Sequence, residues 1–180
     1  MNRKLVIRNA RQSDIATLSE FAIKTYSDAF GHTFTDADLA AHLKKNLTAD
    51  SFSRILDDDV VLLAEVEDLL LGYIQFGAVT LSSADNSEQE LRRLYVHAEF
   101  QNEGYGTALM EAALRHPRLS GAAGIYLDVW EHNHAAQRFY RRFGFDVIGT
   151  RPFEVESGAA TSHDFVMERR ATPDTDSCDR

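Results

Sequence analysis

The feature that most constrains this chain is a glycine-containing turn between a strand-like and a helix-like segment. Residues 90–96 are rich in residue types that favour strands, and residues 107–115 have a helical composition that Pro117 helps to end. Gly104 and Gly106 lie just before this helix. Successive backbone N–H groups in such a turn can bind an anion, with help from the helix dipole. A plain turn is the other interpretation, because the spacing matches neither the dinucleotide fingerprint nor the Walker loop.

Size and composition predict one soluble globular domain. The chain has 180 residues, of which 44% are hydrophobic and 26% are charged, so it can bury a core without disulfides or a structural metal. We assign residues 1–170 to this domain and residues 171–180 to a disordered polar tail that contains Cys178, the single cysteine. No apolar stretch reaches the roughly 20 residues that span a bilayer, and no signal peptide is evident. These absences predict a cytoplasmic protein without a membrane partner.

The charge balance narrows the choice of partners. Lys and Arg number 19 against 28 Asp and Glu, which gives a formal net charge of −9. Such a chain repels polyanions, so nucleic acid is an unfavourable partner, whereas a small cationic molecule is compatible with it. A monomer and a homodimer both remain open.

The rest of the chain predicts strands and helices in alternation. Ser13 or Asp14 can cap a first helix, and Thr35 or Asp36 can start a second. The helix predicted from 134 to 143 carries aromatic residues on one face, Tyr140 among them. The other expected segments are strands at 5–8, 125–129, 145–149 and 164–169, helix near 52–56, and a hairpin of 60–66 with 70–79 that the polar stretch 82–89 ends.

Two motifs give the chain a family resemblance. The strand Glu-Leu-Arg-Arg-Leu-Tyr-Val at 90–96, followed by the loop at 101–106, resembles the central strand and Q/R-x-x-G-x-G/A loop of the Gcn5-related N-acetyltransferase (GNAT) superfamily. The segment 129–145 resembles the next strand, the Asn-Ala helix start and the F-Y-x-x-x-G-F ending of that family. Residues 25–32, 129–131 and 164–167 are most similar to bacterial spermidine/spermine N-acetyltransferases.

The resemblance implies an α/β fold and an acetyl-CoA site. The expected fold is a mixed, mostly antiparallel sheet flanked by helices, with two central strands that splay to admit the cofactor. Two departures are Ala98, where many relatives have proline, and Glu103, where a basic residue is common. The implied cofactor contacts are the backbone of Leu94, Tyr95 and Val96, the loop residues Gln101, Asn102, Glu103, Gly104, Tyr105, Gly106 and Thr107, and further along Asn133, Ala136, Tyr140 and Arg142, with Arg141 as the alternative to Arg142.

The implied chemistry is direct attack of a primary amine on the thioester, without a metal. This reaction needs a base for the amine proton and can use an acid for the leaving thiolate. We predict Glu90 as the base, with Asp128 and Glu131 as alternatives, and Tyr140 as the acid. The competing interpretations are a solvated surface glutamate and a tyrosine that only packs.

The acceptor is expected to be a small, cationic amine, with a polyamine such as spermidine or spermine as the favoured candidate. A protein Nα-terminal or lysine acetyltransferase and a non-catalytic acyl-CoA-binding module are the alternatives.

For the other prominent residues, we expect a structural role before a functional one. Trp130 and Tyr26 are assigned to packing before a substrate groove, the run at 57–59 to a solvated turn before a cation site, and His32, His97, His132 and His134 to ordinary polar positions.

Overall fold

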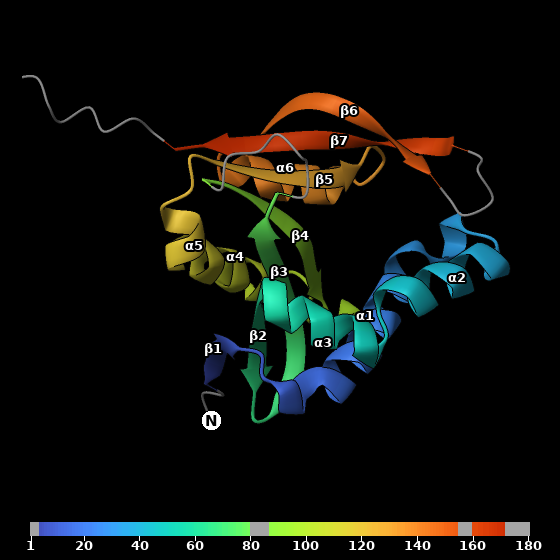
Figure 1. Ribbon diagram of the computed structural model, residues 1–180, viewed down its shortest axis with the longest axis vertical. Coiled ribbons are helices and arrows are strands. Elements are labelled where there is room, and N and C mark those ends of the chain that lie inside the picture. The colour runs from blue at the N-terminus through green and yellow to red at the C-terminus, as the bar shows by residue number, and fades with distance from the viewer. Residues whose placement is uncertain (1–3, 80–86, 155–159, 172–180) are drawn as a thin grey trace, which may run out of the picture.

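The computed structural model describes residues 4–79, 87–154 and 160–171. Within these ranges seven strands form one sheet in the order β1-β2-β3-β4-β5-β7-β6 (Figure 1). The strands are β1 (Leu5–Asn9), β2 (Val60–Val66), β3 (Leu69–Ala78), β4 (Glu88–Val96), β5 (Gly124–Trp130), β6 (Asp146–Glu154) and β7 (Ala160–Arg170). The α-helices are α1 (Ile15–Phe30), α2 (Asp36–Asn46), α3 (Ala49–Asp58), α4 (Tyr105–Arg115), α5 (Pro117–Ser120) and α6 (His134–Arg142). Short 3-10 turns η1 (Gln12–Asp14), η2 (Gly31–Thr33) and η3 (Ala98–Phe100) complete the order.

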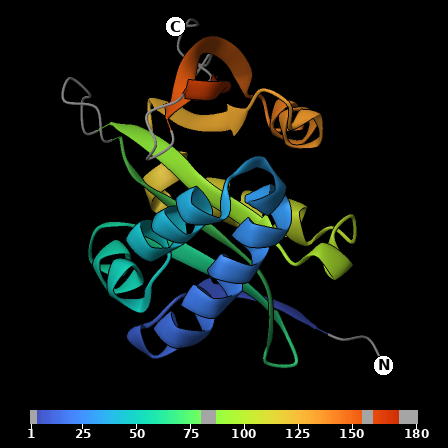
Figure 2. The same cartoon turned by 90° about the vertical axis from the view of Figure 1, so that its right-hand side faces the viewer.

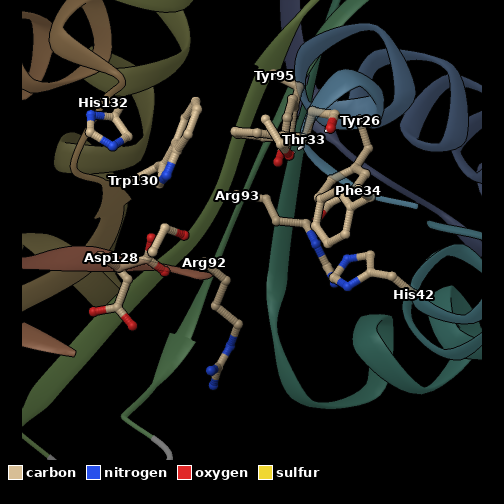
Figure 3. Close-up of a pocket in the computed structure, with 13 residues that line it drawn as sticks. Tyr26, Thr33, Phe34, His42, Arg92, Arg93, Tyr95, Asp128, Trp130 and His132 are labelled. Atoms are coloured by element: carbon tan, nitrogen blue, oxygen red, sulfur yellow. Dashed lines mark hydrogen bonds between the residues drawn. The ribbon is translucent and has the colours of Figure 1, made fainter. Parts of the chain in front are cut away.

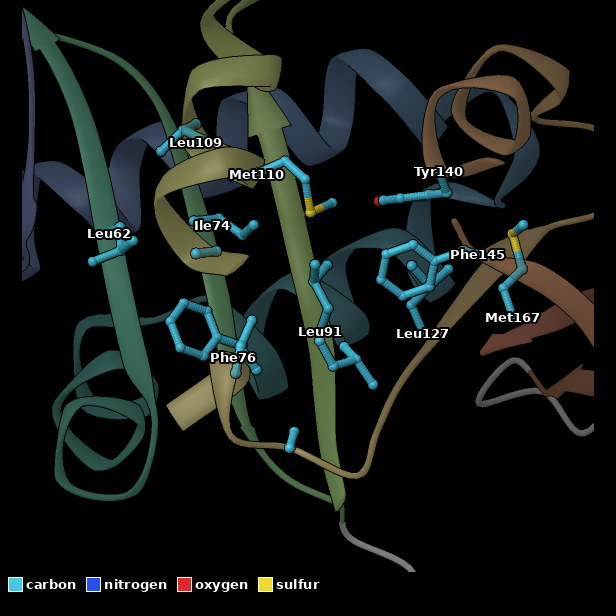
Figure 4. Packing of buried hydrophobic residues seen from close by; sticks show 14 of the residues in the cluster. Leu62, Ile74, Phe76, Leu91, Leu109, Met110, Leu127, Tyr140, Phe145 and Met167 are labelled. Atoms are coloured by element: carbon cyan, nitrogen blue, oxygen red, sulfur yellow. The ribbon is translucent and has the colours of Figure 1, made fainter. Parts of the chain in front are cut away.

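Helices cover the sheet on both faces and create two hydrophobic cores. Figure 2 shows α1, α2 and α3 across one face of the central strands, where Leu18, Phe52 and Tyr73 are buried. The other core, drawn in Figure 4, joins α4 and α6 to the sheet through residues such as Leu109 and Tyr140. The central strands β2 and β3 are buried along nearly their whole length because both faces are covered.

The sheet parts between β4 and β5. All other neighbouring strands are antiparallel, whereas β4 and β5 are parallel and pair only from Glu88 opposite Gly124 to Glu90 opposite Tyr126. Beyond this point β4 continues to Val96 and β5 continues to Trp130, but the two strands no longer pair with each other. A bulge in the β3–β4 ladder falls at Arg92, between the pairs Phe76–Leu91 and Gln75–Arg93. The predicted mixed, mostly antiparallel fold with splayed central strands is therefore confirmed.

Most predicted elements are found, with shifted ends. The hairpin is β2 with β3, and Thr35 caps α2 by accepting a hydrogen bond from the Asp38 N–H at 3.2 Å. Asp14 takes the predicted N-cap position of α1, but its side chain does not cap the helix: its carboxylate accepts from the Arg11 N–H and from Arg8 instead. Most of the predicted polar stretch 82–89, through residue 86, and all but the first residue of the predicted tail lie outside the described residues.

The acidic run at 57–59 is not simply a solvated turn. The Asp59 side chain is only 8% exposed, and its Oδ2 accepts from Gln75 Nε2 at 2.6 Å and from Arg92 Nε at 2.9 Å. A Cβ atom on Gly77 would lie 1.8 Å from the Asp59 carboxylate, so the glycine makes room for it. The prediction failed for this residue because its counter-charge, Arg92, lies far away in the sequence.

Candidate functional site

Three adjoining cavities run through the gap between β4 and β5. The loop cavity, of about 490 Å³, lies between the 101–107 segment and α6. The middle cavity, of about 430 Å³, shares Leu94, Val96 and Tyr140 with it. The aromatic cavity, of about 400 Å³, shares Tyr95 and Asp128 with the middle cavity and opens between α1, α2, β5 and β7. The splay of the sheet therefore lines up three adjoining cavities, a path that runs from the glycine loop to the aromatic cavity.

The glycine loop has the backbone geometry of an anion site. Asn102 and Gly104 both have positive φ, at 65° and 92°, and Gln101 Nε2 braces the turn by donating to the Val96 carbonyl at 3.2 Å. The first N–H groups of α4, beginning at Tyr105, have no helical partner, as at the start of any helix, and no side chain of the described residues caps them. Uncapped N–H groups next to a left-handed turn are a favourable environment for phosphate oxygens.

The structure brings most of the predicted cofactor residues together. Tyr95 lines the middle and aromatic cavities. Glu103 is exposed and lines none of the three cavities, and the Tyr105 ring packs edge-on against Phe100 at 6.4 Å between centroids. The loop cavity is lined by Leu94, Val96, Gln101, Asn102, Gly104, Gly106, Thr107, Asn133, Ala136, Tyr140 and Arg142.

Helix α6 is fixed to the end of β5 by two polar side chains. Asn133 caps the helix, since its Oδ1 accepts from the Ala136 N–H at 3.1 Å. Gln137 is buried and donates to the carbonyls of Trp130 and Glu131, at 3.2 and 2.8 Å. Sequence reasoning missed Gln137, although a polar residue on the helical face that carries Tyr140 is the available signal.

Tyr140 combines a packed ring with a place on the cavity wall. It is 9% exposed, with ring centroids 5.5 Å from Phe139 and 6.0 Å from Phe145, and it lines both the loop and middle cavities. Burial, and secondarily Tyr95, raises the pKa of the Tyr140 hydroxyl above its usual value of 10. The hydroxyl therefore stays protonated near neutral pH and can act as a hydrogen-bond donor.

The predicted base and its alternatives are placed very differently. Glu90 lies outside the residues that line the three cavities, and its Oε2 accepts from Arg92 Nη1 at 2.6 Å. Glu131 also lines none of them and accepts from the His163 N–H at 2.9 Å. Asp128 lines both the middle and aromatic cavities, where burial raises its pKa although Arg151 Nη1 donates to it at 2.9 Å. Asp128 is thus the one among the three that faces the path.

Asp164 is a carboxylate that sequence reasoning did not select. It lies on β7 directly opposite Trp130 of β5 and lines the aromatic cavity. Burial raises its pKa from 3.8 to about 6, and the charge of Asp128 adds to the shift while Arg151 opposes it. The sequence carries no local signal for this role, because the pairing of β7 with β5 alone brings Asp164 to the pocket.

Aromatic side chains from two parts of the chain wall this pocket. Figure 3 shows Tyr26, Phe34 and His42 on one side and Trp130 on the other. Tyr26 is both packed and exposed to the cavity, since it stacks on His42 at 4.4 Å between centroids. Trp130 belongs to neither buried core cluster and lines two cavities, so the assignment of Trp130 to packing first is wrong.

The four histidines that stood out in the sequence are dispersed over the fold rather than gathered at one point. His132 lines the aromatic cavity, His97 accepts from the Glu99 N–H within η3, and His134 begins α6. His32 lies in η2 and is exposed. Across residues 4–79, 87–154 and 160–171, no group of three or more His, Cys, Asp or Glu side chains has the arrangement of a metal site.

Comparison with known proteins identifies the family. The family model described as the acetyltransferase (GNAT) family matches residues 19–145. The chain belongs to the GNAT family. An uncharacterised N-acetyltransferase of Mycobacterium tuberculosis is 30% identical over 159 residues, which is 87% of this chain and 97% of that protein. The crystal structure of the PaiA N-acetyltransferase from Thermoplasma acidophilum in complex with coenzyme A superposes with a TM-score of 0.76 at 21% identity, over 93% of this chain and 99% of that one.

A shorter similarity links the GNAT chain to a polyamine enzyme. The spermine/spermidine N(1)-acetyltransferase of Bacillus subtilis is 31% identical over 90 residues, covering 48% of this chain and 59% of that protein. Membership of the family makes this protein an N-acetyltransferase that uses acetyl-CoA. Within the described part of the chain, no helix is long and apolar enough to cross a membrane.

Proposed function

We propose that this GNAT enzyme binds acetyl-CoA along the loop and middle cavities and transfers the acetyl group to an amine held in the aromatic cavity. The observation that carries the proposal is the row of adjoining cavities through the splayed sheet. At one end lie the positive-φ turn at Asn102 and Gly104 and the uncapped start of α4; at the other lie Asp128 and Asp164. The first end suits a pyrophosphate and the second suits a protonated amine.

Binding would use backbone more than side chains. The side of β4 that faces β5 has no strand partner beyond Glu90, so the backbone of Leu94, Tyr95 and Val96 can pair with the amide groups of the pantetheine arm. The first N–H groups of α4 would hold the pyrophosphate, and Arg142, which already lies 5.3 Å from the centre of the Phe139 ring, would meet the outer phosphates.

For the chemistry, we assign Tyr140 to the leaving sulfur. The neutral amine attacks the thioester carbonyl, the C–S bond breaks, and the amine proton passes to a base. A free thiol has a pKa near 8.5, which is below the raised pKa of Tyr140. Complete proton transfer from Tyr140 to the thiolate is therefore uphill, and the hydroxyl serves best by donating a hydrogen bond as charge develops on sulfur.

The base remains a choice between direct and relayed proton removal. Glu90 keeps this role in our proposal only through a water molecule, since its carboxylate is held by Arg92 and lies off the cavity wall. Asp128 faces both the middle and aromatic cavities, so it can receive the proton directly. The pH profiles of Glu90→Gln and Asp128→Asn variants separate the two, because of these two variants only the one that replaces the base should lose the inflection caused by that base.

For the acceptor, we propose a small primary amine. The partial similarity to the Bacillus subtilis polyamine enzyme supports a polyamine, and the carboxylates of the aromatic cavity suit any cationic amine. A protein N-terminus or lysine and a catalytically silent module are the competing functions. Purified protein should be mixed with acetyl-CoA and polyamines, amino acids, aminoglycosides or peptides, and thiol release measured. Release with any small amine supports the proposal; acetyl-CoA binding without release from the whole panel would favour the silent module.

A further inference from the structure

Arg93 is a partly buried cation without a carboxylate partner in the described part of the chain. Its Nη1 donates to the Gln75 side-chain oxygen at 2.5 Å and its Nη2 donates to the Asn46 carbonyl at 3.4 Å, and both acceptors are neutral. The neighbouring Arg92 is different, because Asp59 and Glu90 bind it at 2.9 and 2.6 Å. A guanidinium removed from water gains most from an anion, and two neutral hydrogen bonds offset only part of that cost.

Arg93 lines the aromatic cavity from the wall opposite the carboxylates. Figure 3 shows its side chain directed towards His42, whereas Asp128 lies on the Trp130 side. Asp164 also belongs to the Trp130 side, because it pairs with Trp130 across β5 and β7. The two charges act on the same ring: burial raises the pKa of Tyr95 to about 12 overall, with Arg93 lowering it and Asp164 raising it. The cavity is therefore bipolar, with a cation on one wall and carboxylates on the other.

Asp164 makes no hydrogen bond or ion pair with the described residues, although Arg151 lies opposite it on β6 and its charge lowers the Asp164 pKa. Asp128 has Arg151 as its partner, so Asp164 is the carboxylate of this cavity whose charge is left for a ligand. A ligand with one positive and one negative group would compensate both walls at once. A polyamine would compensate only Asp164 and would bring a second ammonium group towards Arg93.

We infer that the acceptor is an amine that also carries an oxyanionic group, with the amine at Asp164 and the oxyanion at Arg93. The inference rests on the proposed function and narrows its acceptor to amino-acid-like molecules. Arginine suits this task because its planar fork can bind both oxygens of a carboxylate, or two oxygens of a phosphonate. The other role available to Arg93 is structural, since it also binds a carbonyl at the C-terminal end of α2.

The test compares acceptors that differ only in the group at the far end. Putrescine, butylamine, γ-aminobutyrate and the matching aminoalkyl phosphonate present a cation, no charge, a carboxylate and a phosphonate on similar chains. α-Amino acids, in which the amine lies next to the carboxylate, and their amides, which lack the negative charge, extend the comparison to a shorter spacing. With acetyl-CoA saturating, kcat/KM should be highest for an anionic member. Arg93→Gln should raise KM for that acceptor by about 10- to 100-fold and leave the KM for butylamine and acetyl-CoA unchanged.

Two further variants separate recognition from folding. Arg93→Lys keeps the charge but loses the fork, so it should fall between wild type and Arg93→Gln. Arg54→Gln removes the same charge from an exposed residue that does not line the aromatic cavity, and should leave every KM unchanged. A higher kcat/KM for putrescine than for all anionic acceptors, or an equal loss for every acceptor in Arg93→Gln, would overturn the inference.

Failure of the proposed function would look different. If no amine releases thiol, titration of γ-aminobutyrate and putrescine into the protein with coenzyme A, followed by NMR, still reports binding. Preferential binding of the anionic amine that Arg93→Gln abolishes would support the bipolar pocket without acetyl transfer. If γ-aminobutyrate bound no more tightly than putrescine, the bipolar pocket would be rejected.

Discussion

The loop cavity and the aromatic cavity satisfy their polar groups in opposite ways. Around the loop cavity, Asn133, Gln137 and Gln101 each bond to backbone groups within seven residues of themselves. Around the aromatic cavity, Arg93 and Asp164 come from different strands, and neither forms an ion pair with another described residue. In the first region, polar side chains are satisfied by nearby backbone groups, and in our proposal the cavity binds the cofactor that all family members use. The second leaves charge to be compensated by its ligand, and this is where specificity can differ between relatives.

The largest effect should come from the point where the two cavities meet. Tyr140→Phe keeps the packed ring and removes the hydroxyl, so kcat should fall by ~10²–10⁴-fold if the hydroxyl stabilises the leaving sulfur. The acetyl-CoA dissociation constant, measured by calorimetry, and the thermal midpoint should change little. A wild-type kcat under conditions where chemistry limits the rate would reduce Tyr140 to a packing residue.

The next effect tests the aromatic cavity through pH. Asp164 must be ionised to hold a protonated amine, so kcat/KM of the wild type should rise as pH increases through about 6. Asp164→Asn should remove this inflection and lower kcat/KM above it by about 10- to 100-fold. Asp146→Asn, an exposed change of the same charge on β6, is the control. An inflection that survives in Asp164→Asn would assign it to another group.

The raised pKa of Asp164 also predicts how folding stability changes with pH. Its pKa in the folded chain, about 6, lies above the ordinary 3.8, so the folded state binds the proton more tightly than the unfolded state. The stability contributed by this group is full below about pH 4 and is lost as pH rises to about 6. Asp164→Asn should therefore raise the thermal midpoint at neutral pH but not at acid pH. A lower midpoint at neutral pH would mean that Asp164 has a stabilising partner.

Substitutions at the two glycines of the loop should have different effects, one on folding stability and the other on acetyl-CoA affinity. Gly104 has a φ of 92°, so Gly104→Ala should cost about 1–2 kcal/mol of folding free energy, measured by denaturant unfolding. A Cβ on Gly106 would meet its nearest neighbours, in Phe139 and Val96, at an ordinary 3.7 Å. Gly106→Val should therefore leave stability nearly intact and raise the acetyl-CoA dissociation constant about 10-fold by obstructing the phosphate site. Unchanged affinity in folded Gly106→Val would remove the loop from the cofactor site.

The contrast between the cavities also explains what the sequence could predict. The loop and the start of α6 are continuous motifs, so Gly104, Gly106 and Asn133 could be selected from spacing and resemblance. The aromatic cavity is assembled from α1, α2, β4, β5 and β7, and its members become neighbours only through strand pairing. Arg93 and Asp164 have no local signature, because an unpaired charge is a property of the folded surroundings.

Glu90 marks the limit of resemblance. Its place on the central strand suggested a base, and it stays a prediction for a relayed proton transfer. The bulge at Arg92 and the buried Asp59 decide its surroundings, and neither could be anticipated from the sequence around Glu90. Side-chain partners across strands depend on register, and register depends on bulges that composition does not reveal.

The smallest effect concerns the core beneath the aromatic cavity, where Tyr73 is fully buried and its hydroxyl has no hydrogen-bond partner among the described residues. Tyr73→Phe keeps the ring contacts with Phe52 and Tyr95 and removes a polar atom whose burial is costly. Stability should be unchanged or higher by up to about 1 kcal/mol, which is about 2–4 °C in thermal midpoint for a chain of this size.

The matched control is Tyr126→Phe, because the Tyr126 hydroxyl lies within hydrogen-bond distance of the Glu88 and Glu168 carboxylates, at 3.0 and 2.9 Å, and donates its single proton between them. Losing these charge-assisted bonds should cost about 1–3 kcal/mol. Calorimetry of both variants under one condition gives the comparison. Equal destabilisation by the two changes would mean that the Tyr73 hydroxyl is hydrogen-bonded, for example to a buried water, and that the core on this side of the sheet is as fully satisfied as the polar side chains around the loop cavity.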